Sequence, residues 1–181
     1  MAITTFAAID IGSYEVSMKI FEFSRKIGFR QLSDVRYRLE IGKGAYSSGR
    51  LEPEVVDAIC GILRDFDKMM KEFGVSDYRA CATSAFREMV NPLIIQEQIY
   101  RRTGIHVEIL SNAEQHFLGY KSIAAKEASF KKMIQKGTAI LDVGGGGLQV
   151  SLFDKDALVM TQSLKMGSLR IRERLKELEK T

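Results

Sequence analysis

Tryptophan is absent from the 181-residue sequence, and proline, cysteine and histidine occur only twice each. With so little proline, no proline-rich linker separates domains. Neither His106 nor His116 has a cysteine neighbour at metal-ligand spacing, which argues against a zinc-type cluster. Cys60 and Cys81 lie in apolar patterns, as expected for buried, reduced thiols in a cytoplasmic protein.

Long apolar runs are also missing. No stretch of 18 apolar residues occurs, so we expect no membrane span and no membrane partner. The opening MAITTFAAID has neither a basic start nor a cleavable apolar core, so we expect no signal peptide and predict a cytoplasmic location. The net charge of +4 favours anionic partners but is too small to indicate a specific nucleic-acid ligand. The sequence leaves a homodimer open.

Hydrophobic periodicity predicts an α/β protein in the order βββ-α-β-α-β, then a helix, then βββ-α. The predicted strands cover residues 5–10, 15–23, 31–41, 78–83, 106–110, 138–142, 148–153 and 157–164. The predicted helices cover residues 53–73, 84–104 with a break near Asn91-Pro92, 112 to about 136, and 167–180. The glycine- and serine-rich stretch 42–51 is predicted to be a loop. The helix that starts at residue 112 marks the boundary between two expected domains, 1–111 and 112–181.

The second half of this pattern repeats the first. Asp10 and Asp142 each end an apolar strand and begin an Asp-x-Gly turn, 132 residues apart. Skipping two glycines of the second copy then places Ser13 on Gly147. Two such hairpins, each opening a βββα series, predict duplicated lobes that face one another.

Glycine-rich turns suit phosphate, because backbone amides with no Cβ beside them can converge on an anionic oxygen. An aspartate at the end of the preceding strand suits Mg²⁺, which takes carboxylate and phosphate oxygens. A bare Asp-x-Gly hairpin also occurs as a purely structural turn. The run of four glycines exceeds what a two-residue hairpin needs. Together with the duplication, it favours a phosphate chain clamped with Mg²⁺ between the turns of Asp10 and Asp142.

Six stretches of the sequence carry a more specific signal. They are, in chain order, AAIDIGS (7–13), GKGAYSSGRLEPE (42–54), ATSAFREMVN (82–91), IHVEILSNAEQ (105–115), ILDVGGGG (140–147) and LKMGSLRI (164–171). Together they resemble the motifs of the exopolyphosphatase/guanosine pentaphosphate phosphatase (Ppx/GppA) family of the actin-like ATPase superfold. The resemblance implies duplicated RNase H-like βββαβαβ lobes, the first complete and the second only begun (βββα). It also implies removal of the terminal phosphate of inorganic polyphosphate, or of the 5′ phosphate of guanosine pentaphosphate (pppGpp), with Mg²⁺.

Carried onto this sequence, the family motifs imply two sets of binding residues. The phosphate-binding set is Gly12, Ser13, Thr83, Arg87, Gly144, Gly145, Gly146 and Gly147, and the metal-binding set is Asp10 and Asp142. Arg87 would hold phosphate oxygens with both arms of its guanidinium group. The alternative for Arg87 is an exposed helix residue paired with Glu88 or Glu114.

The chain departs from the family pattern at the acids expected to act on water. Gln115 stands where the family has the glutamate that serves as general base, Gln149 replaces a second glutamate, and Gly147 replaces a serine. Glutamine cannot accept a proton at neutral pH, and the loss of a well-placed base costs about 10²–10⁴-fold in rate. Glu114 points about 100° away from Gln115 on a helix, so it would substitute only after a register shift. Glu15 is a further carboxylate that could compensate.

Two hypotheses from different classes follow. The first is a Ppx/GppA-type phosphohydrolase, retained or weak, with Gln115, Glu114, Arg87 and Gln149 as its catalytic set. The second is a catalytically impaired relative that binds polyphosphate or pppGpp as a sensor or scaffold. A sugar or acetate kinase of the same superfold is disfavoured, because ATSAFRE is not a kinase motif.

Overall fold

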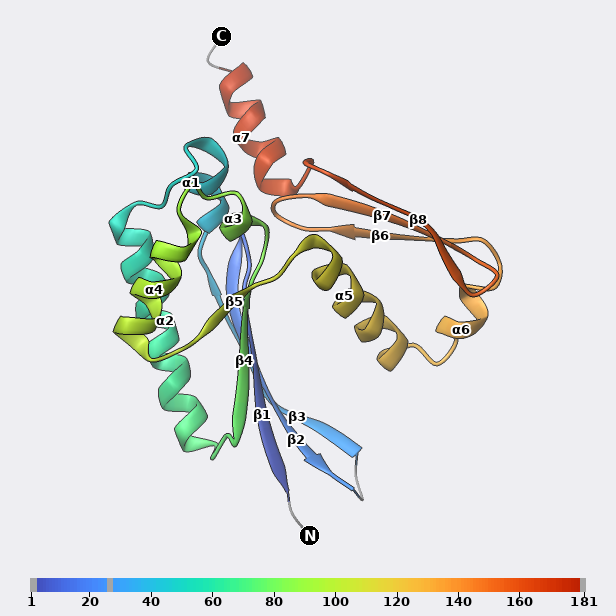
Figure 1. Cartoon of the computed structure of the whole chain (residues 1–181), viewed down its shortest axis with the longest axis horizontal. Helices are drawn as coiled ribbons and strands as arrows, with labels where there is room; N and C mark the ends of the chain where they lie inside the picture. Colours follow the sequence, from blue (N-terminus) through green and yellow to red (C-terminus); the bar gives the residue numbers. More distant parts are fainter. Residues whose placement is uncertain (1–2, 26–27, 180–181) are drawn as a thin grey trace. The chain divides into compact units, whose positions relative to one another are not determined.

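The computed structural model describes residues 3–25 and 28–179. The chain forms two compact units, Met1–Ile109 and Leu110–Thr181 (Figure 1). Each unit contains one β-sheet accompanied by helices, which confirms the expected α/β class. No helix in the described ranges is both long enough and apolar enough to cross a membrane.

A five-stranded sheet forms the centre of the first unit, in the order β3-β2-β1-β4-β5. Its strands are β1 (Thr4–Ile11), β2 (Glu15–Ser24), β3 (Gly28–Arg38), β4 (Asp77–Ala82) and β5 (Val107–Ile109). The first three pair antiparallel, whereas β4 runs parallel to β1 and β5 runs parallel to β4. The carboxyl ends of β1, β4 and β5 therefore meet at one edge of the sheet, where open α/β sheets bind ligands.

The helices of the first unit are α1 (Ile41–Ser47), α2 (Pro53–Glu72), α3 (Ser84–Arg87) and α4 (Pro92–Thr103) (Figure 1). The break between α3 and α4 lies where the sequence predicts it. The prediction of a loop over 42–51 is wrong for its first part, which is α1. The Gly42 amide donates to the Ser13 carbonyl oxygen at 2.8 Å, and a Cβ on Gly44 would lie 2.6 Å from the Arg50 carbonyl oxygen. These glycines thus allow close packing rather than marking a loop.

The core of the first unit lies between its sheet and the apolar stripe of α2. That stripe consists of Val56, Ile59, Cys60, Leu63, Phe66 and Met70, at helical spacing. Cys60 and Cys81 are free thiols, the first buried and the second partly buried. Burial raises the pKa of the Cys60 thiol, so Cys60 stays protonated and packs as a small apolar residue.

The second unit contains α5, α6, a three-stranded antiparallel sheet and α7. Their bounds are α5 (Asn112–Lys126), α6 (Phe130–Met133), β6 (Thr138–Val143), β7 (Leu148–Asp154), β8 (Ala157–Leu164) and α7 (Ser168–Leu178). The strands match their predicted ranges to within one residue. The single helix predicted over 112–136 is interrupted after Lys126, because the Glu127 carboxylate accepts hydrogen bonds from the amide and hydroxyl of Ser129 and the chain turns there, and helical structure resumes in α6.

One face of the second sheet is packed by α5 and α6. The rings of Tyr120 and Phe130 meet Phe153 of β7 edge to face, with ring centroids 5.2 Å and 6.3 Å apart. Phe153 is consequently buried. This side of the sheet is the apolar core of the second unit.

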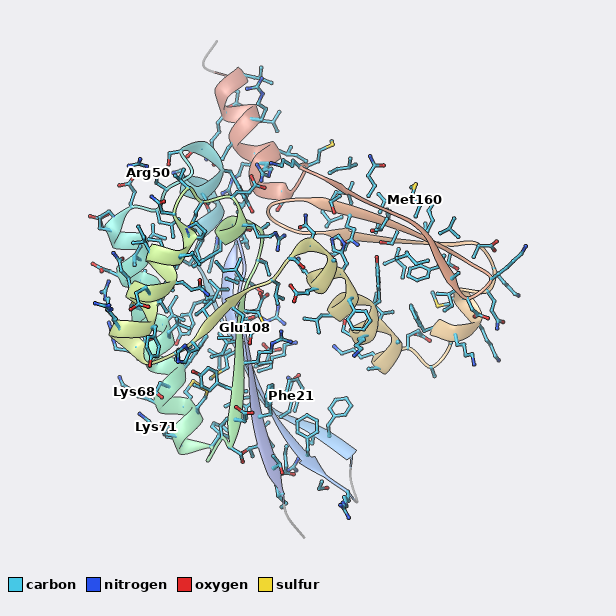
Figure 2. The ribbon with its side chains drawn as sticks, in the orientation of Figure 1. Phe21, Arg50, Lys68, Lys71, Glu108 and Met160 are labelled. Atoms are coloured by element: carbon cyan, nitrogen blue, oxygen red, sulfur yellow. The ribbon has the colours of Figure 1, made fainter. Side chains whose placement is uncertain are left out.

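The opposite face of the second sheet is open. Leu141 and Val143 of β6 are 64% and 68% exposed, whereas their counterparts in β1, Ile9 and Ile11, are buried. Met160 of β8, labelled in Figure 2, is also exposed. Positions that helices cover in the first unit are therefore uncovered in the second, as expected for a second lobe that is only begun.

Candidate functional site

The turn between β1 and β2 holds the first group of expected site residues. Asp10 lies near the end of β1, opposite Ser17 of β2. The Gly12 amide donates to the Glu15 carbonyl oxygen at 2.9 Å and closes the turn. A Cβ on Gly12 would come within 3.0 Å of that same oxygen, so glycine fits this position best.

The turn between β6 and β7 is built in the same way. Asp142 lies opposite Gln149, and the Gly144 amide donates to the Gly147 carbonyl oxygen, again at 2.9 Å. The residues of this turn follow their counterparts in the first turn at a constant spacing of 132 in the numbering. The internal repeat predicted from the sequence is therefore present in the hydrogen bonding of both hairpins.

This constant spacing corrects the alignment of the two copies. The expected gap of two glycines placed Ser13 on Gly147, but strand pairing places Ser13 on Gly145 and Glu15 on Gly147. The gapped alignment matches Val16-Ser17 with Val150-Ser151, a dipeptide that occurs in both return strands. Turn length is fixed by the pairing of the flanking strands, which overrides the dipeptide match.

Carbonyl oxygens of the β6–β7 turn point at the start of α7. The Gly144 carbonyl oxygen accepts from the Ser168 amide at 3.0 Å. The Gly146 carbonyl oxygen accepts from Arg170 Nε at 2.6 Å. Among the described residues, the amides of Gly145 and Gly146 donate to no backbone carbonyl oxygen.

The β1–β2 turn is anchored through its carbonyl oxygens as well. The Ser13 carbonyl oxygen accepts from the Gly42 amide at 2.8 Å, and the Tyr14 carbonyl oxygen accepts from the Leu39 amide at 3.1 Å. The segment that leads into α1 thus fixes the first turn, as the start of α7 fixes the second.

Gly167 is a structural support of the second turn that the sequence analysis missed. It is buried directly before α7, and a Cβ there would lie 2.3 Å from both the Gly145 carbonyl oxygen and the Gly147 amide nitrogen. Gly167 belongs to the LKMGSLRI stretch, but nothing local in that stretch reveals which backbone it touches.

We expect Gly167→Ala to lower the free energy of unfolding by about 2–3 kcal/mol, because the added Cβ would push away the Gly145 carbonyl oxygen and the Gly147 amide nitrogen. Denaturant unfolding followed by circular dichroism measures this loss. Gly119→Ala is the matched control, since its Cβ would meet nothing within 4 Å and alanine favours a helix by about 1 kcal/mol. Equal stability of Gly167→Ala and the wild type would contradict the close packing.

The surroundings of Asp10 favour its uncharged form. Desolvation by the neighbouring protein, and then the negative charge of Glu15, raise the pKa of Asp10 from 3.8 to about 6, although the residue still reaches solvent. A divalent cation beside two carboxylates relieves such repulsion, so the donors fit Mg²⁺. In residues 3–25 and 28–179, no group of three or more His, Cys, Asp or Glu side chains is placed to hold a metal ion. Phosphate oxygens and water would therefore complete the coordination.

Asp10→Asn should stabilise the metal-free protein at high pH and leave it unchanged at low pH. Between pH 3.8 and about 6 the folded state binds more protons than the unfolded state, so the free energy of unfolding falls as pH rises through this window. The full shift corresponds to about 3 kcal/mol, which solvent screening at this exposed residue reduces to about 1 kcal/mol. Urea unfolding without Mg²⁺ at about pH 8 and pH 4 measures the difference. A variant less stable than the wild type at the higher pH would refute the raised pKa, and a Glu15→Gln background should shrink the gain.

The segment after β4 brings Thr83 and Arg87 to the edge where β1 ends. The Thr83 amide donates to the Ile11 carbonyl oxygen at 3.3 Å. Arg87 ends α3 and is partly buried. Desolvation lowers the pKa of Arg87, opposed by Tyr46 and then Glu88, and the guanidinium group stays charged at neutral pH. Partial burial strengthens the attraction of this charge for an anion compared with a fully solvated helix residue.

Tyr46 and Ser84 join this edge of the sheet, and neither was predicted as a site residue. Ser13 Oγ lies 2.7 Å from Ser84 Oγ, and the Tyr46 hydroxyl lies 2.8 Å from Ser84 Oγ. The Tyr46 hydroxyl also contacts Ser13 Oγ directly. Tyr46 falls in the segment that was predicted to be a loop. The only indication of Ser84 in the sequence analysis was its place in the ATSAFREMVN stretch.

Gln149 lies in a cluster of hydroxyl groups in the second unit. Its side-chain nitrogen is 3.0 Å from the Tyr120 hydroxyl and 3.1 Å from those of Ser151 and Thr161. Gln149 and Asp142 also line a cavity of about 290 Å³ with residues of α5, β6 and β7. The side-chain amide of Gln149 donates to this cluster, which an ionised carboxylate could not do.

Glu114 and Gln115 lie in the first turn of α5. The Ser111 hydroxyl accepts from the Glu114 amide at 3.2 Å, and the Glu114 carboxylate accepts from the Ser111 amide at 2.8 Å. This reciprocal pair is a capping box at the start of α5. The Glu114 carboxylate is therefore engaged at the helix end, while Gln115 is partly buried beside it.

The comparison with protein families decides the identity of the chain. Residues 20–177 match the Ppx/GppA phosphatase family. This chain belongs to the Ppx/GppA phosphatase family. Five of the six stretches quoted from the sequence, from residue 42 to residue 171, lie within the matched range.

Two relatives illustrate the range of proteins to which this chain is similar. Exopolyphosphatase 2 of Mycobacterium tuberculosis is 25% identical over 96% of this chain and 56% of the relative. Guanosine-5′-triphosphate,3′-diphosphate pyrophosphatase of Vibrio atlanticus is 20% identical over 93% of this chain and 33% of the relative. The chain thus spans just over half the length of the exopolyphosphatase.

Solved structures confirm the fold. The crystal structure of the Aquifex aeolicus Ppx/GppA family member superposes with a TM-score of 0.75, at 23% identity, over 95% of this chain and 54% of that chain. The actin-like class expected from the sequence is confirmed by this agreement in fold. The similarity covers the first lobe and the beginning of a second.

Proposed function

We propose that this chain binds inorganic polyphosphate or pppGpp and hydrolyses a terminal phosphate slowly with Mg²⁺. Membership of the Ppx/GppA phosphatase family supports the reaction type. The observation that carries the proposal is the pair of equivalent Asp-x-Gly turns, each closed by a glycine amide at 2.9 Å and anchored through its carbonyl oxygens. A cytoplasmic location and a homodimer remain predictions.

In this proposal both turns bind phosphate oxygens, and the charged side chain of Arg87 assists. The binding groups are Gly12, Ser13, Thr83, Arg87, Gly144, Gly145, Gly146 and Gly147. Asp10 and Asp142 would hold Mg²⁺, which supplies neutralisation of phosphate charge when it is bound. The raised pKa of Asp10 fits this role, because a desolvated carboxylate that also faces the negative charge of Glu15 is stabilised by a nearby cation.

Slow turnover is proposed because the positions that would activate water are glutamines. Gln115 has no basic group at neutral pH. Glu114, next to it, is held in the capping box of α5. The proposed slow hydrolysis therefore depends on substrate binding, orientation and charge neutralisation, without help from a strong base.

The second candidate is a sensor or scaffold that binds these ligands without turnover. The environment of Gln149 favours it, because three hydroxyl groups surround the side-chain amide at 3.0–3.1 Å. These contacts suit a side-chain amide, rather than a carboxylate, at position 149 of the second unit.

Phosphate release from medium-chain polyphosphate and from pppGpp distinguishes the candidates. The intact chain would be assayed with MgCl₂ and, in parallel, with EDTA. Release that requires Mg²⁺ supports the hydrolase. Saturable binding without release supports the sensor, and the absence of both binding and release contradicts the two candidates together.

A further inference from the structure

Three hydroxyl groups form a closed triangle beside the β1–β2 turn. They belong to Ser13, Tyr46 and Ser84, which come from the turn, from α1 and from the start of α3. A hydroxyl group donates one hydrogen bond and accepts up to two. Three groups in three mutual contacts can use every donor within the triangle, so a ligand oxygen must compete for them.

The triangle sits where a phosphate would be attracted. Ser13 is buried, and its carbonyl oxygen is fixed by the Gly42 amide at 2.8 Å. Arg87 lies close enough to Tyr46 for the two side chains to interact electrostatically. The α1 segment thus brings its tyrosine, the first turn and a cationic side chain to one edge of the sheet.

The three hydroxyl groups differ in donor strength. A phenol is more acidic than an aliphatic alcohol and is therefore the stronger hydrogen-bond donor. Either oxygen can be the donor in the contacts of Tyr46 with the two serines, and the greater donor strength of the phenol favours donation from Tyr46 to a serine oxygen. The serine that accepts this bond is polarised, and its own O–H becomes a better donor toward a third group.

We propose that Tyr46 is a positioning residue that directs the Ser13 and Ser84 hydroxyl groups at a bound phosphate. The inference rests on the proposed function in that a phosphate must bind at the first turn. Tyr46 acts through the serines, and its ring packs against the core of the first unit. Tyr46→Phe keeps that packing and removes only the donor.

Calorimetric titration of the intact chain with sodium tripolyphosphate in MgCl₂ tests the proposal. We expect Tyr46→Phe to weaken binding about 5- to 10-fold, the effect of about one hydrogen bond. Adding Tyr46→Phe to the double variant Ser13→Ala/Ser84→Ala should weaken binding no further, because Tyr46 then has no serine hydroxyl group left to direct. Tyr78→Phe is the matched control, since its hydroxyl accepts from the His106 amide elsewhere in the unit.

The outcomes distinguish the positioning role of Tyr46 from the proposed function of the chain. Unchanged affinity in Tyr46→Phe overturns the positioning role and leaves the proposed function in place. A further loss when Tyr46→Phe is added to Ser13→Ala/Ser84→Ala shows that Tyr46 does not act through the serines, and also overturns the positioning role. A wild-type chain that does not bind tripolyphosphate overturns both the positioning role and the proposed function.

Discussion

Gln115→Glu should raise the rate of phosphate release from polyphosphate by about 10²-fold or more, because the variant gains a carboxylate able to accept a proton from water. The position lies in the first turn of α5, where a negative charge is also favoured by the helix dipole. The rate is measured as phosphate released per chain under saturating polyphosphate with MgCl₂.

Gln98→Glu is the matched control for this gain. It makes the same chemical change on an exposed position of α4 and should leave the rate unchanged. Comparable turnover of the wild type and Gln115→Glu would show that another group serves as the base. The explanation of slow turnover by Gln115 would then be wrong.

Arg87→Ala is expected to weaken tripolyphosphate binding about 30-fold or more, since hydrogen bonds from a charged donor to a charged acceptor contribute about 1.5–3 kcal/mol each. Arg87→Lys should recover part of this loss, because it keeps the charge but loses the planar fork. Calorimetric titration at fixed ionic strength measures the three dissociation constants.

Arg101→Ala serves as the control for Arg87→Ala. Arg101 pairs with Glu97 on the exposed side of α4 at 2.6 Å, so its removal takes away a positive charge without touching the turns. Equal losses for the two variants would show that net charge alone drives binding. A specific role of Arg87 requires a much larger loss at Arg87.

The hairpins and their acids were predictable because their signals are local. Alternating side chains mark β2 and β7, and each Asp-x-Gly turn stands between two strands. Each of the two aspartates consequently lies opposite a residue of the strand that follows its turn, Asp10 opposite Ser17 and Asp142 opposite Gln149, as the repeat predicts. The family motifs added Thr83 and Arg87, which the parallel pairing of β4 with β1 brings to the end of β1.

The features that were missed depend on contacts between distant residues. α1 contains two glycines and one serine among its seven residues, a composition typical of a loop, and it is held by the β1–β2 turn through Gly42. Tyr46 meets Ser13 and Ser84 across sequence separations of 33 and 38 residues. The gap in the repeat was misplaced for a similar reason, since strand pairing rather than sequence similarity sets the register.

Amide hydrogen exchange with and without tripolyphosphate tests most directly whether both turns bind phosphate. The exchange rates of residues 10–15 and 142–147 would be compared in MgCl₂ at saturating ligand. Binding through the backbone amides predicts slower exchange in both turns, with the β2–β3 hairpin unchanged. Unaltered exchange in both turns, despite saturation of the protein with tripolyphosphate, would contradict the account.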